Sequence, residues 1–269
     1  MTVLITGSEG FIGRNLVATL KAQGKDVLEF DTKNYRPEEL FSLYDMTDVK
    51  MIYHLGAISS TLDTNLDALY RHNVEFSIDL FNMAISHKIP VVYTTSASVF
   101  GNTMKDGQYI YNPLNYYATT KMLTEMWLFQ NRSKFRILSV PRLFNVYGAD
   151  ERKSDMSTSP ICKFTQQAKE TGVITLFKGS HEMIRDFICI EDVLQVLIDI
   201  PKWGFYDVGT CLPISFQEIA EMIADKYNAT IRYVPMPDNM KPSYQYYTKA
   251  RQNVIWCKTV EQWINSQPK

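Results

Sequence analysis

The sequence opens with a hydrophobic strand that runs directly into a glycine turn and then a helix. Residues 3–6 read Val-Leu-Ile-Thr, and Gly7, Gly10 and Gly13 follow at intervals of three. A turn this tight lets backbone N–H groups approach an anion closely, and the helix that begins there offers further unpaired N–H groups. The order therefore predicts a site for the pyrophosphate of a dinucleotide. The spacing differs from the general Gly-x-Gly-x-x-Gly fingerprint, so a strand-to-helix turn without a ligand stays an alternative.

A second predicted strand, residues 27–31, ends in Asp31. This position lies about 20 residues beyond the glycine turn, where a carboxylate reaches the ribose of an adenosine. Thr32 and Lys33 follow at once and Arg36 lies close, and a nearby cation is how such a site accommodates a 2′-phosphate. NAD and NADP both remain open as the cofactor. The segment from here to His54 is short, so we expect the usual intermediate strand to be shortened or lost.

Composition narrows the class of protein. The chain has 269 residues, of which 45% are hydrophobic, and its 28 basic and 29 acidic residues give a formal net charge of −1. Such a chain buries a large core, but it has no basic field that would recruit nucleic acid or anionic lipid. It lacks the run of about 18 apolar residues that a membrane span requires. Because Met1 leads straight into a core strand, we expect no signal peptide and a cytoplasmic protein.

Cysteine and histidine are scattered along the chain rather than grouped at the spacings of a metal site. We expect reduced cysteines, most of them buried, and no metal. The residues concerned are Cys162, Cys189, Cys211, Cys257, His54, His72, His87 and His181.

Two further predicted strands end in small residues that a ligand can approach. Residues 51–55 form an apolar strand that runs into Gly56, and residues 89–93 begin the next strand. The second strand leads into residues 94–98, a run of small and mostly polar side chains. Ligands of open parallel sheets bind beyond the carboxyl ends of the strands, so Ser96 is well placed to act in a site.

The segment after Pro113 is a predicted helix on which Tyr117 and Lys121 stand four residues apart. This spacing puts both side chains on one face of the helix. A tyrosine of ordinary pKa, about 10, is a poor base at neutral pH, but a neighbouring ammonium group and a nicotinamide cation both favour its phenolate. Tyr117 is thus a candidate base for a hydroxyl proton, with Ser96 bound to the same oxygen. Taken alone, the pair also fits an ordinary tyrosine beside a solvated lysine.

Together these features resemble the extended short-chain dehydrogenase/reductase family, which contains nucleotide-sugar epimerases and dehydratases. The resemblance covers residues 1–250 and includes the glycine turn, the strand end at residues 54–57, Ser96, Tyr117 and Lys121 in the family's order. It implies an α/β fold, with a doubly wound parallel sheet of the Rossmann type and a smaller C-terminal substrate-binding lobe. The apolar helices of such a fold also offer a face for a homo-oligomer.

The resemblance also implies how the chain divides. Residues 1–145 are expected to form the dinucleotide-binding domain, to which part of residues 174–209 returns. Residues 146–173 and 210–269 are expected to form the lobe that closes over the substrate.

Within the family, several strings resemble the ADP-L-glycero-D-manno-heptose 6-epimerases. They are residues 57–61, 113–117, 142–148, 176–180, 185–187 and 235–238. This resemblance implies epimerisation of a nucleotide-activated sugar, most closely ADP-D-glycero-D-manno-heptose to its L-glycero isomer. In that reaction bound NAD or NADP takes hydride from C6, and the hydride returns to the opposite face of the ketone.

The family's roles can be carried over residue by residue. The resemblance implies Ser96, Tyr117 and Lys121 as catalytic residues and Lys153 as the acid–base group on the second face of the carbon. The loop around Lys153 is one residue shorter than the family's, so Arg152 stays an alternative there. The implied cofactor-binding residues are Gly7, Gly10, Phe11, Ile12, Gly13, Asp31, Thr32, Lys33, Leu55, Gly56, Ala57, Asn73, Tyr117 and Lys121. The implied substrate-binding residues are Ser59, Thr61, Ser96, Asn145, Lys153, Phe177, Arg185 and Tyr244.

Three other functions compete with this interpretation. A UDP-sugar 4-epimerase, or another NDP-sugar enzyme of the family, would share the serine, tyrosine and lysine and differ in the sugar that it turns over. A 4,6-dehydratase would need an Asp-Glu pair beside the active serine, where this chain has Ala97 and Ser98. A non-catalytic nucleotide-binding regulator would not need Tyr117 or Lys121, both of which are present.

Overall fold

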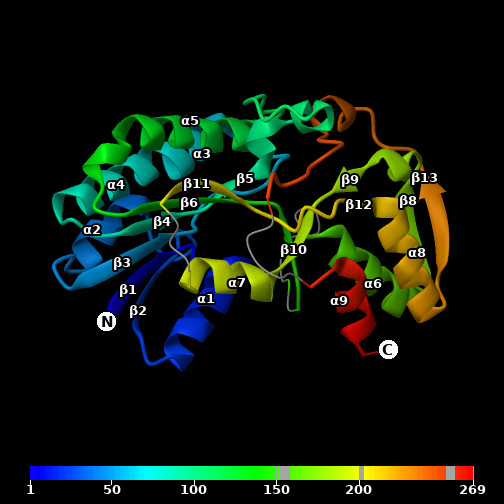
Figure 1. The fold of residues 1–269 in the computed structure, drawn as a ribbon, viewed down its shortest axis with the longest axis horizontal. Coiled ribbons are helices and arrows are strands. Elements are labelled where there is room, and N and C mark those ends of the chain that lie inside the picture. The colour runs from blue at the N-terminus through cyan, green and yellow to red at the C-terminus, as the bar shows by residue number, and fades with distance from the viewer. Residues whose placement is uncertain (150, 152–157, 200–202, 253–257, 269) are drawn as a thin grey trace. The chain divides into compact units, whose positions relative to one another are not determined.

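Three segments of the sequence make up each of two units, and each unit has its own apolar core (Figure 1). The structure is a computed structural model that describes residues 1–149, 151, 158–199, 203–252 and 258–268. The first unit consists of Met1–Ser96, Asn115–Arg142 and Leu197–Tyr206. The second consists of Ala97–Leu114, Leu143–Val196 and Asp207–Lys269.

A seven-stranded sheet is the framework of the first unit. Its order is β11-β6-β4-β3-β1-β2, with β5 paired to β6, and the pairs from β2 to β6 along this order are parallel. The strands are β1 Thr2–Thr6, β2 Asp26–Phe30, β3 Val49–His54, β4 Val91–Tyr93, β5 Thr95–Ser96, β6 Leu138–Leu143 and β11 Gly204–Val208. The chain goes from β1 out to β2 and then returns to the other side of β1 for β3. The strand order therefore reverses between β1 and β3, as in the predicted Rossmann-type sheet, and ligands of such sheets bind at this reversal.

β2 lies at the edge of this sheet. Residues 31–48, all of which the structure describes, contain only the 3-10 turn η1 Pro37–Glu39 and the short helix α2 Leu40–Leu43. The prediction that the strand after Asp31 is shortened or lost is confirmed, since helical turns replace it.

Helices cover both faces of the sheet. In Figure 1, α3, α4 and α5 lie along one face and α1 along the other. Their bounds are α1 Phe11–Ala22, α3 Leu66–Tyr70, the π-helical segment η2 Arg71–Glu75, α4 Phe76–Ser86, α5 Tyr116–Asn131 and the 3-10 turn η5 Arg132–Lys134. On α4, Leu80, Phe81 and Ala84 are fully buried, and the ring of Phe81 lies 5.3 Å from that of Tyr93 on β4. This apolar stripe fixes the helix on the sheet.

The second unit contains three two-stranded sheets among its described residues, β10-β7, β12-β9 and β13-β8. Its strands are β7 Asn145–Tyr147, β8 Val173–Phe177, β9 Ile184–Arg185, β10 Phe187–Cys189, β12 Ile214–Ser215 and β13 Thr230–Val234. Its helices are α6 Pro160–Thr171, α7 Ile190–Asp199, α8 Phe216–Tyr227 and α9 Val260–Ser266, and its 3-10 turns are η3 Ala97–Phe100, η4 Thr103–Asp106, η6 Ser180–Glu182 and η7 Lys241–Ser243. Helix α9 buries Val260, Trp263 and Ile264. The spacing of these three residues is that of one face of an amphipathic helix. Within the described ranges, no helix combines the length and the apolar character that crossing a bilayer requires.

Candidate active site

The ends of β1 and β3 approach each other so closely that side chains do not fit between them. Gly7 has a φ of +70°, and a Cβ there would lie 2.6 Å from Cα of Gly56. A Cβ on Gly13 would lie 1.9 Å from the carbonyl oxygen of Gly7. Helix α1 begins within this space, and its N-cap residue, Gly10, provides no side chain to bind the first N–H groups. The unpaired N–H groups of α1 lie where the strand order reverses, so they can bind a pyrophosphate. The residues present therefore fit a dinucleotide.

Asp31, the predicted ribose contact, is buried at the end of β2. Its carboxylate accepts hydrogen bonds from the backbone N–H of Glu9 and from that of Lys33, both at 3.0 Å. The first bond fixes the glycine turn, and the second shapes the loop after β2. The same carboxylate thus links two segments that were predicted to bind the cofactor.

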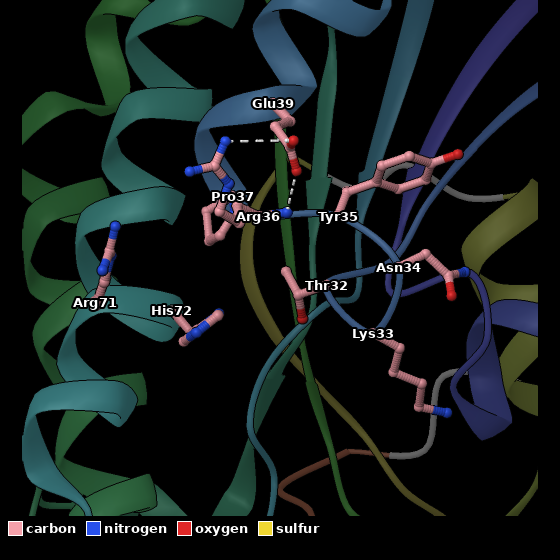
Figure 2. Close-up of a pocket in the computed structure, with 9 residues that line it drawn as sticks. All are labelled: Thr32, Lys33, Asn34, Tyr35, Arg36, Pro37, Glu39, Arg71 and His72. Carbon is pink, nitrogen blue, oxygen red and sulfur yellow. Dashed lines mark hydrogen bonds and ion pairs between the residues drawn. The ribbon is translucent and has the colours of Figure 1, made fainter.

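A pocket of about 330 Å³ lies beside this loop (Figure 2). Its lining residues are Thr32, Lys33, Asn34, Tyr35, Arg36, Pro37, Glu39, Arg71 and His72. Three of these residues are cationic and one is anionic. Lys33 and Arg36 come from the predicted loop, whereas Arg71 comes from η2, about 40 residues later, which sequence reasoning did not single out.

Two features of this pocket suit an anion. All three cations meet carboxylates: Arg71 meets Glu38 and Arg36 meets Glu39, both at 3.5 Å, and Lys33 meets Glu9 at 3.9 Å. Exposed pairs of this kind are weak, so a phosphate can compete for the cations. The Nδ1 atom of His72 is buried and has no hydrogen-bond partner in the described part of the chain. Burial lowers the pKa of His72, and Arg71 lowers it further. The pocket therefore combines incompletely balanced cations with a polar atom that lacks a partner.

The structure brings Ser96 and Tyr117 into contact within the first unit. Helix α5 begins after Asn115, whose side chain caps it by accepting a hydrogen bond from the backbone N–H of Ala118. Tyr117 lies in its first turn, and Ser96 ends β5. A hydrogen bond from Ser96 lowers the pKa of the Tyr117 phenol, although burial raises that pKa by more. The structure therefore joins the predicted serine and tyrosine by a hydrogen bond.

Lys121 is buried one turn further along α5. Its Nζ donates a hydrogen bond of 2.9 Å to the carbonyl oxygen of Thr94 and lies 4.6 Å from the ring centroid of Tyr93. Burial lowers the pKa of Lys121 to about 7, while the carboxylate of Glu125 acts in the opposite direction. Near neutral pH this lysine therefore gains and loses its proton readily.

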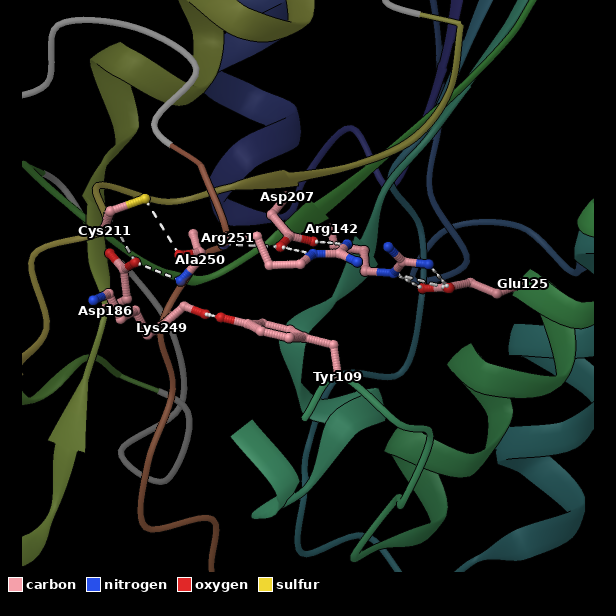
Figure 3. A network of polar contacts seen from close by, with 9 residues as sticks. All are labelled: Tyr109, Glu125, Arg142, Asp186, Asp207, Cys211, Lys249, Ala250 and Arg251. Atoms are coloured by element: carbon pink, nitrogen blue, oxygen red, sulfur yellow. Dashed lines mark hydrogen bonds and ion pairs between the residues drawn. The ribbon is translucent and has the colours of Figure 1, made fainter. Parts of the chain in front are cut away.

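A buried ion pair beyond Lys121 was not predicted. Glu125 is fully buried on α5, and Arg142 of β6 is 6% exposed. Arg142 donates from Nε and Nη2 to the carboxylate of Glu125, with a shortest distance of 2.7 Å, as Figure 3 shows. The same carboxylate accepts a 2.7 Å hydrogen bond from the hydroxyl of Thr95. The glutamate follows Tyr117 and Lys121 at the same four-residue interval, which is the signal that could have found it.

Asn73 and His54 join the cofactor turn to α5. The side chain of Asn73 accepts a hydrogen bond from the backbone N–H of Ile58 and donates one to the hydroxyl of Thr120. His54 is fully buried and contacts Thr6 at 2.6 Å and Ser77 at 2.8 Å through its two ring nitrogens. Burial lowers the pKa of His54 to about 3, so the ring is neutral. Asn73, predicted to bind the cofactor, therefore also fixes the loop that follows β3.

Arg185 is the most unusual charged residue of the second unit. Its side chain is buried between two aromatic rings, with the guanidinium carbon 5.3 Å from the ring centroid of Tyr244 and 5.7 Å from that of Phe216. Its polar contacts are with the carbonyl oxygen of Ile184, at 3.2 Å, and with the side chain of Tyr244. Burial lowers its pKa, and no carboxylate in the described part of the chain forms an ion pair with it. The predicted residues Arg185 and Tyr244 are thus in contact, and Tyr244 packs against the buried positive charge of Arg185.

The neighbouring Asp186 organises the segments around Arg185. Its carboxylate accepts hydrogen bonds from the backbone N–H groups of Thr210, Cys211 and Ala250 at 2.8 to 2.9 Å. Figure 3 shows Asp186 with the last two of these residues. Asn145 donates from its amide to the carbonyl oxygen of Asp186 at 2.9 Å. The amide nitrogen of this predicted substrate contact is therefore already bound within the unit.

The remaining predicted residues are more dispersed. Ser59 and Thr61 are exposed in the loop after β3, and Phe177 is partly buried at the end of β8. Lys153 and its alternative, Arg152, lie outside the described residues, as does Cys257. The other three cysteines are free thiols, and no group of metal-ligating side chains occurs among the described residues.

Comparison with known proteins shows what this chain is related to. It matches the model of the NAD dependent epimerase/dehydratase family over residues 3–200. It is 31% identical over 284 residues to the ADP-L-glycero-D-manno-heptose-6-epimerase of Alkalilimnicola ehrlichii, covering 92% of this chain and 88% of that protein.

Two solved structures share the fold. The ADP-L-glycero-D-manno-heptose-6-epimerase of Helicobacter pylori superposes with a TM-score of 0.82 at 24% identity, over 98% of this chain and 94% of that one. The UDP-glucose 4-epimerase of Thermotoga maritima, determined with UDP-glucose, gives a TM-score of 0.80 at 20% identity, over 98% of each chain. The predicted fold, cofactor class and enzyme class, an NAD(P)-dependent nucleotide-sugar epimerase, are confirmed. The chain belongs to the NAD dependent epimerase/dehydratase family.

Proposed function

We propose that this enzyme inverts C6 of ADP-D-glycero-D-manno-heptose to give the L-glycero isomer. The observation that carries the proposal is the contact between Ser96 and Tyr117, with Lys121 on the next turn of α5. The same unit contains the glycine turn. The name of the 31% identical relative supports the heptose as the sugar and ADP as the nucleotide.

The residues of the first unit can move a proton at the reacting hydroxyl. Tyr117 would accept the C6 hydroxyl proton: the Ser96 hydrogen bond lowers its pKa against the raising effect of burial, and the positive charge of a bound oxidised nicotinamide would lower it further. Ser96 would bind the same sugar oxygen and orient it. The glycine turn and Asp31 would hold the dinucleotide, which supplies the hydride acceptor and donor when bound.

Inversion also requires a proton donor on the second face of the carbon. A single group bound to one side of a planar ketone does not reach both faces, so we assign this role to Lys153. The assignment rests on the family's order of residues. Arg152, the neighbouring alternative, is too weak an acid to exchange protons.

We assign the diphosphate of the substrate to Arg185. A buried guanidinium without a carboxylate partner is costly, and an anion with two or more oxygens would satisfy its planar set of donors. Tyr244 and Phe216, which contact the two sides of this group, would fix its orientation.

We further propose that the enzyme prefers NADP to NAD. The support is the pocket after β2, where Lys33, Arg36 and Arg71 surround a space that a 2′-phosphate would fill, with His72 offering an unpaired nitrogen. Arg36→Gln with Arg71→Gln should weaken NADP binding by about 30-fold and change NAD binding by less than about threefold. Titration of both cofactors by tryptophan fluorescence measures this ratio, and Arg232→Gln, in an exposed strand of the second unit, is the control. An equal loss for both cofactors would remove the preference.

The reaction can be tested directly. The purified enzyme is incubated with ADP-D-glycero-D-manno-heptose, and NMR of the recovered sugar reports the configuration at C6. We expect conversion to the L-glycero isomer in the wild type and about a thousandfold loss of kcat in Tyr117→Phe, which still binds the cofactor. Unchanged heptose together with interconversion of UDP-glucose and UDP-galactose would move the assignment to a 4-epimerase, the activity named for the Thermotoga maritima neighbour.

A further inference from the structure

Three side chains on consecutive turns of α5 each contact one of the residues Thr94, Thr95 and Ser96, which follow β4. Tyr117 shares a hydrogen bond with Ser96, and Lys121 Nζ donates to the carbonyl oxygen of Thr94. Glu125 accepts a hydrogen bond of 2.7 Å from the hydroxyl of Thr95. The spacing of four residues aligns the three side chains along the helix, and the contacted residues are consecutive in the sequence. Each contact therefore fixes a different residue of the segment that carries the serine.

The carboxylate of Glu125, which binds Thr95, is also bound by Arg142. Arg142 binds the Glu125 carboxylate through two nitrogens, at 2.7 to 3.1 Å, and the three side chains of this contact, those of Thr95, Glu125 and Arg142, are nearly inaccessible to solvent. The guanidinium carbon of Arg142 in turn lies 5.4 Å from the ring centroid of Phe205. A carboxylate fixed in this way has one preferred position, so Thr95 is fixed with it.

The strand that carries Ser96 is too short to fix it firmly by itself. β5 consists of two residues, Thr95 and Ser96, and it pairs with one other strand, β6. The backbone ladder of so short a strand constrains it weakly. The position of the Ser96 hydroxyl therefore depends on what fixes its neighbour.

We propose that Thr95 and Glu125, with Arg142 as the counter-ion, are positioning residues that set the contact between Ser96 and Tyr117. They touch neither substrate nor cofactor in this assignment, and they act through Ser96. The inference rests on the proposed function, because Ser96 and Tyr117 are the groups whose alignment it explains.

Thr95→Val tests the link without disturbing the ion pair, because valine has the same shape and lacks the hydroxyl. We expect kcat to fall about tenfold, while KM and the dissociation constant of the cofactor stay within about twofold. Thr95→Ser, which restores the hydroxyl, should recover kcat to within about threefold of the wild type. Wild-type kcat in Thr95→Val, or an equal loss in Thr95→Ser, would overturn the proposal.

Thr124→Val is the matched control. Thr124 is fully buried on the same helix, and its hydroxyl donates to the backbone carbonyl oxygens of Asn73 and Thr120 rather than to the strand that carries Ser96. We expect this variant to lose stability but to keep the wild-type kcat. The same fall in kcat as in Thr95→Val would show that any lost buried hydroxyl slows the enzyme, and it would overturn the proposal.

A second readout does not depend on the substrate, so it separates this inference from the proposed reaction. Tyrosine labelled with ¹³C at Cζ, with Tyr117 assigned by its loss in Tyr117→Phe, reports the pH at which the phenol ionises. Loosening the Ser96 hydrogen bond should raise the pKa of Tyr117 in Thr95→Val by about half a unit or more and leave it unchanged in Thr95→Ser. The other charged or titratable groups around this site, none of which the substitution alters, are Tyr93, His54, Lys121, Glu125 and Arg142.

If no sugar is turned over by the wild type, the proposed function fails, and the titration alone decides the inference. A Tyr117 pKa that is the same in Thr95→Val as in the wild type would then refute it.

Discussion

Arg142 and Arg185 are buried to the same extent, each with 6% of its surface exposed, yet their surroundings differ. In the first unit, Arg142 makes a bidentate pair with Glu125. In the second unit, Arg185 lies between the rings of Tyr244 and Phe216, and no described carboxylate pairs with it. One charge is balanced within the chain, and the other has no balancing anion among the residues that the structure describes.

The difference in partners distinguishes an arginine whose charge stabilises the fold from one whose charge is suited to bind a ligand. Taking a guanidinium out of water is costly, and a chain recovers this cost when it provides the counter-ion itself. Where it does not, the unfavourable free energy is available to bind an anion. The amino-acid type and its burial are the same in the two cases, so only the partner distinguishes them.

The largest expected effect comes from removing the counter-ion of Arg142. Glu125→Ala leaves an unpaired buried charge, so the free energy of unfolding should fall by about 3–5 kcal/mol. Urea denaturation followed by circular dichroism measures the change. A loss below about 1 kcal/mol would mean that Arg142 does not depend on Glu125, and the contrast between the two arginines would disappear.

Replacing both members of the pair is expected to cost much less. In Glu125→Met with Arg142→Met no charge remains to be compensated, so stability should return to within about 2 kcal/mol of the wild type. The same urea titration reports it. If the double variant is as unstable as Glu125→Ala, then the hydrogen bond from Thr95, rather than the charge balance, is the source of the loss.

Arg185→Met should behave in the opposite way. Removing a buried charge that lacks a partner should leave the free energy of unfolding unchanged or raise it by about 1 kcal/mol, whereas the affinity for ADP should fall about 10- to 100-fold. Calorimetric titration with ADP and urea denaturation measure the two effects, with Arg232→Met as an exposed control. Destabilisation with unchanged ADP affinity would place Arg185 among the structural charges.

At neutral pH the smallest effect concerns a buried base that remains neutral, because its pH dependence appears only below pH 6.5. The folded pKa of His54 is about 3, below its ordinary value of 6.5, so the unfolded state binds more protons between these limits. Its contribution to stability is complete above pH 6.5 and falls by about 1.4 kcal/mol per pH unit as the pH drops through this window. Compared with the wild type, His54→Gln should show a slope that is shallower by this amount. Equal slopes from pH 6.5 to pH 4 would show that His54 is protonated in the folded protein.

Local patterns predicted the parts of the site that depend on neighbouring residues in the sequence. The glycine turn follows from the spacing of Gly7, Gly10 and Gly13, and the common face of Tyr117 and Lys121 follows from helical geometry. The buried residues of α9 likewise share one face because of helical geometry.

Contacts between distant residues could not be found in this way. Nothing near Arg142 or Arg185 in the sequence tells which one meets a carboxylate, because that depends on which side chains the fold brings to them. Arg71 and His72 were likewise missed as pocket residues, since their place beside the loop after β2 arises from packing.

The sheet edge at β2 has a consequence for the behaviour of the protein in solution. A strand with a neighbour on one side exposes backbone N–H and C=O groups that another chain can pair with. β2 is short, and it carries Asp26 and Glu29, of which Glu29 also meets the exposed Lys21 at 2.6 Å. Negative charge along this margin repels a second copy that presents the same strand. The acidic side chains of β2 therefore disfavour edge-to-edge pairing of two copies.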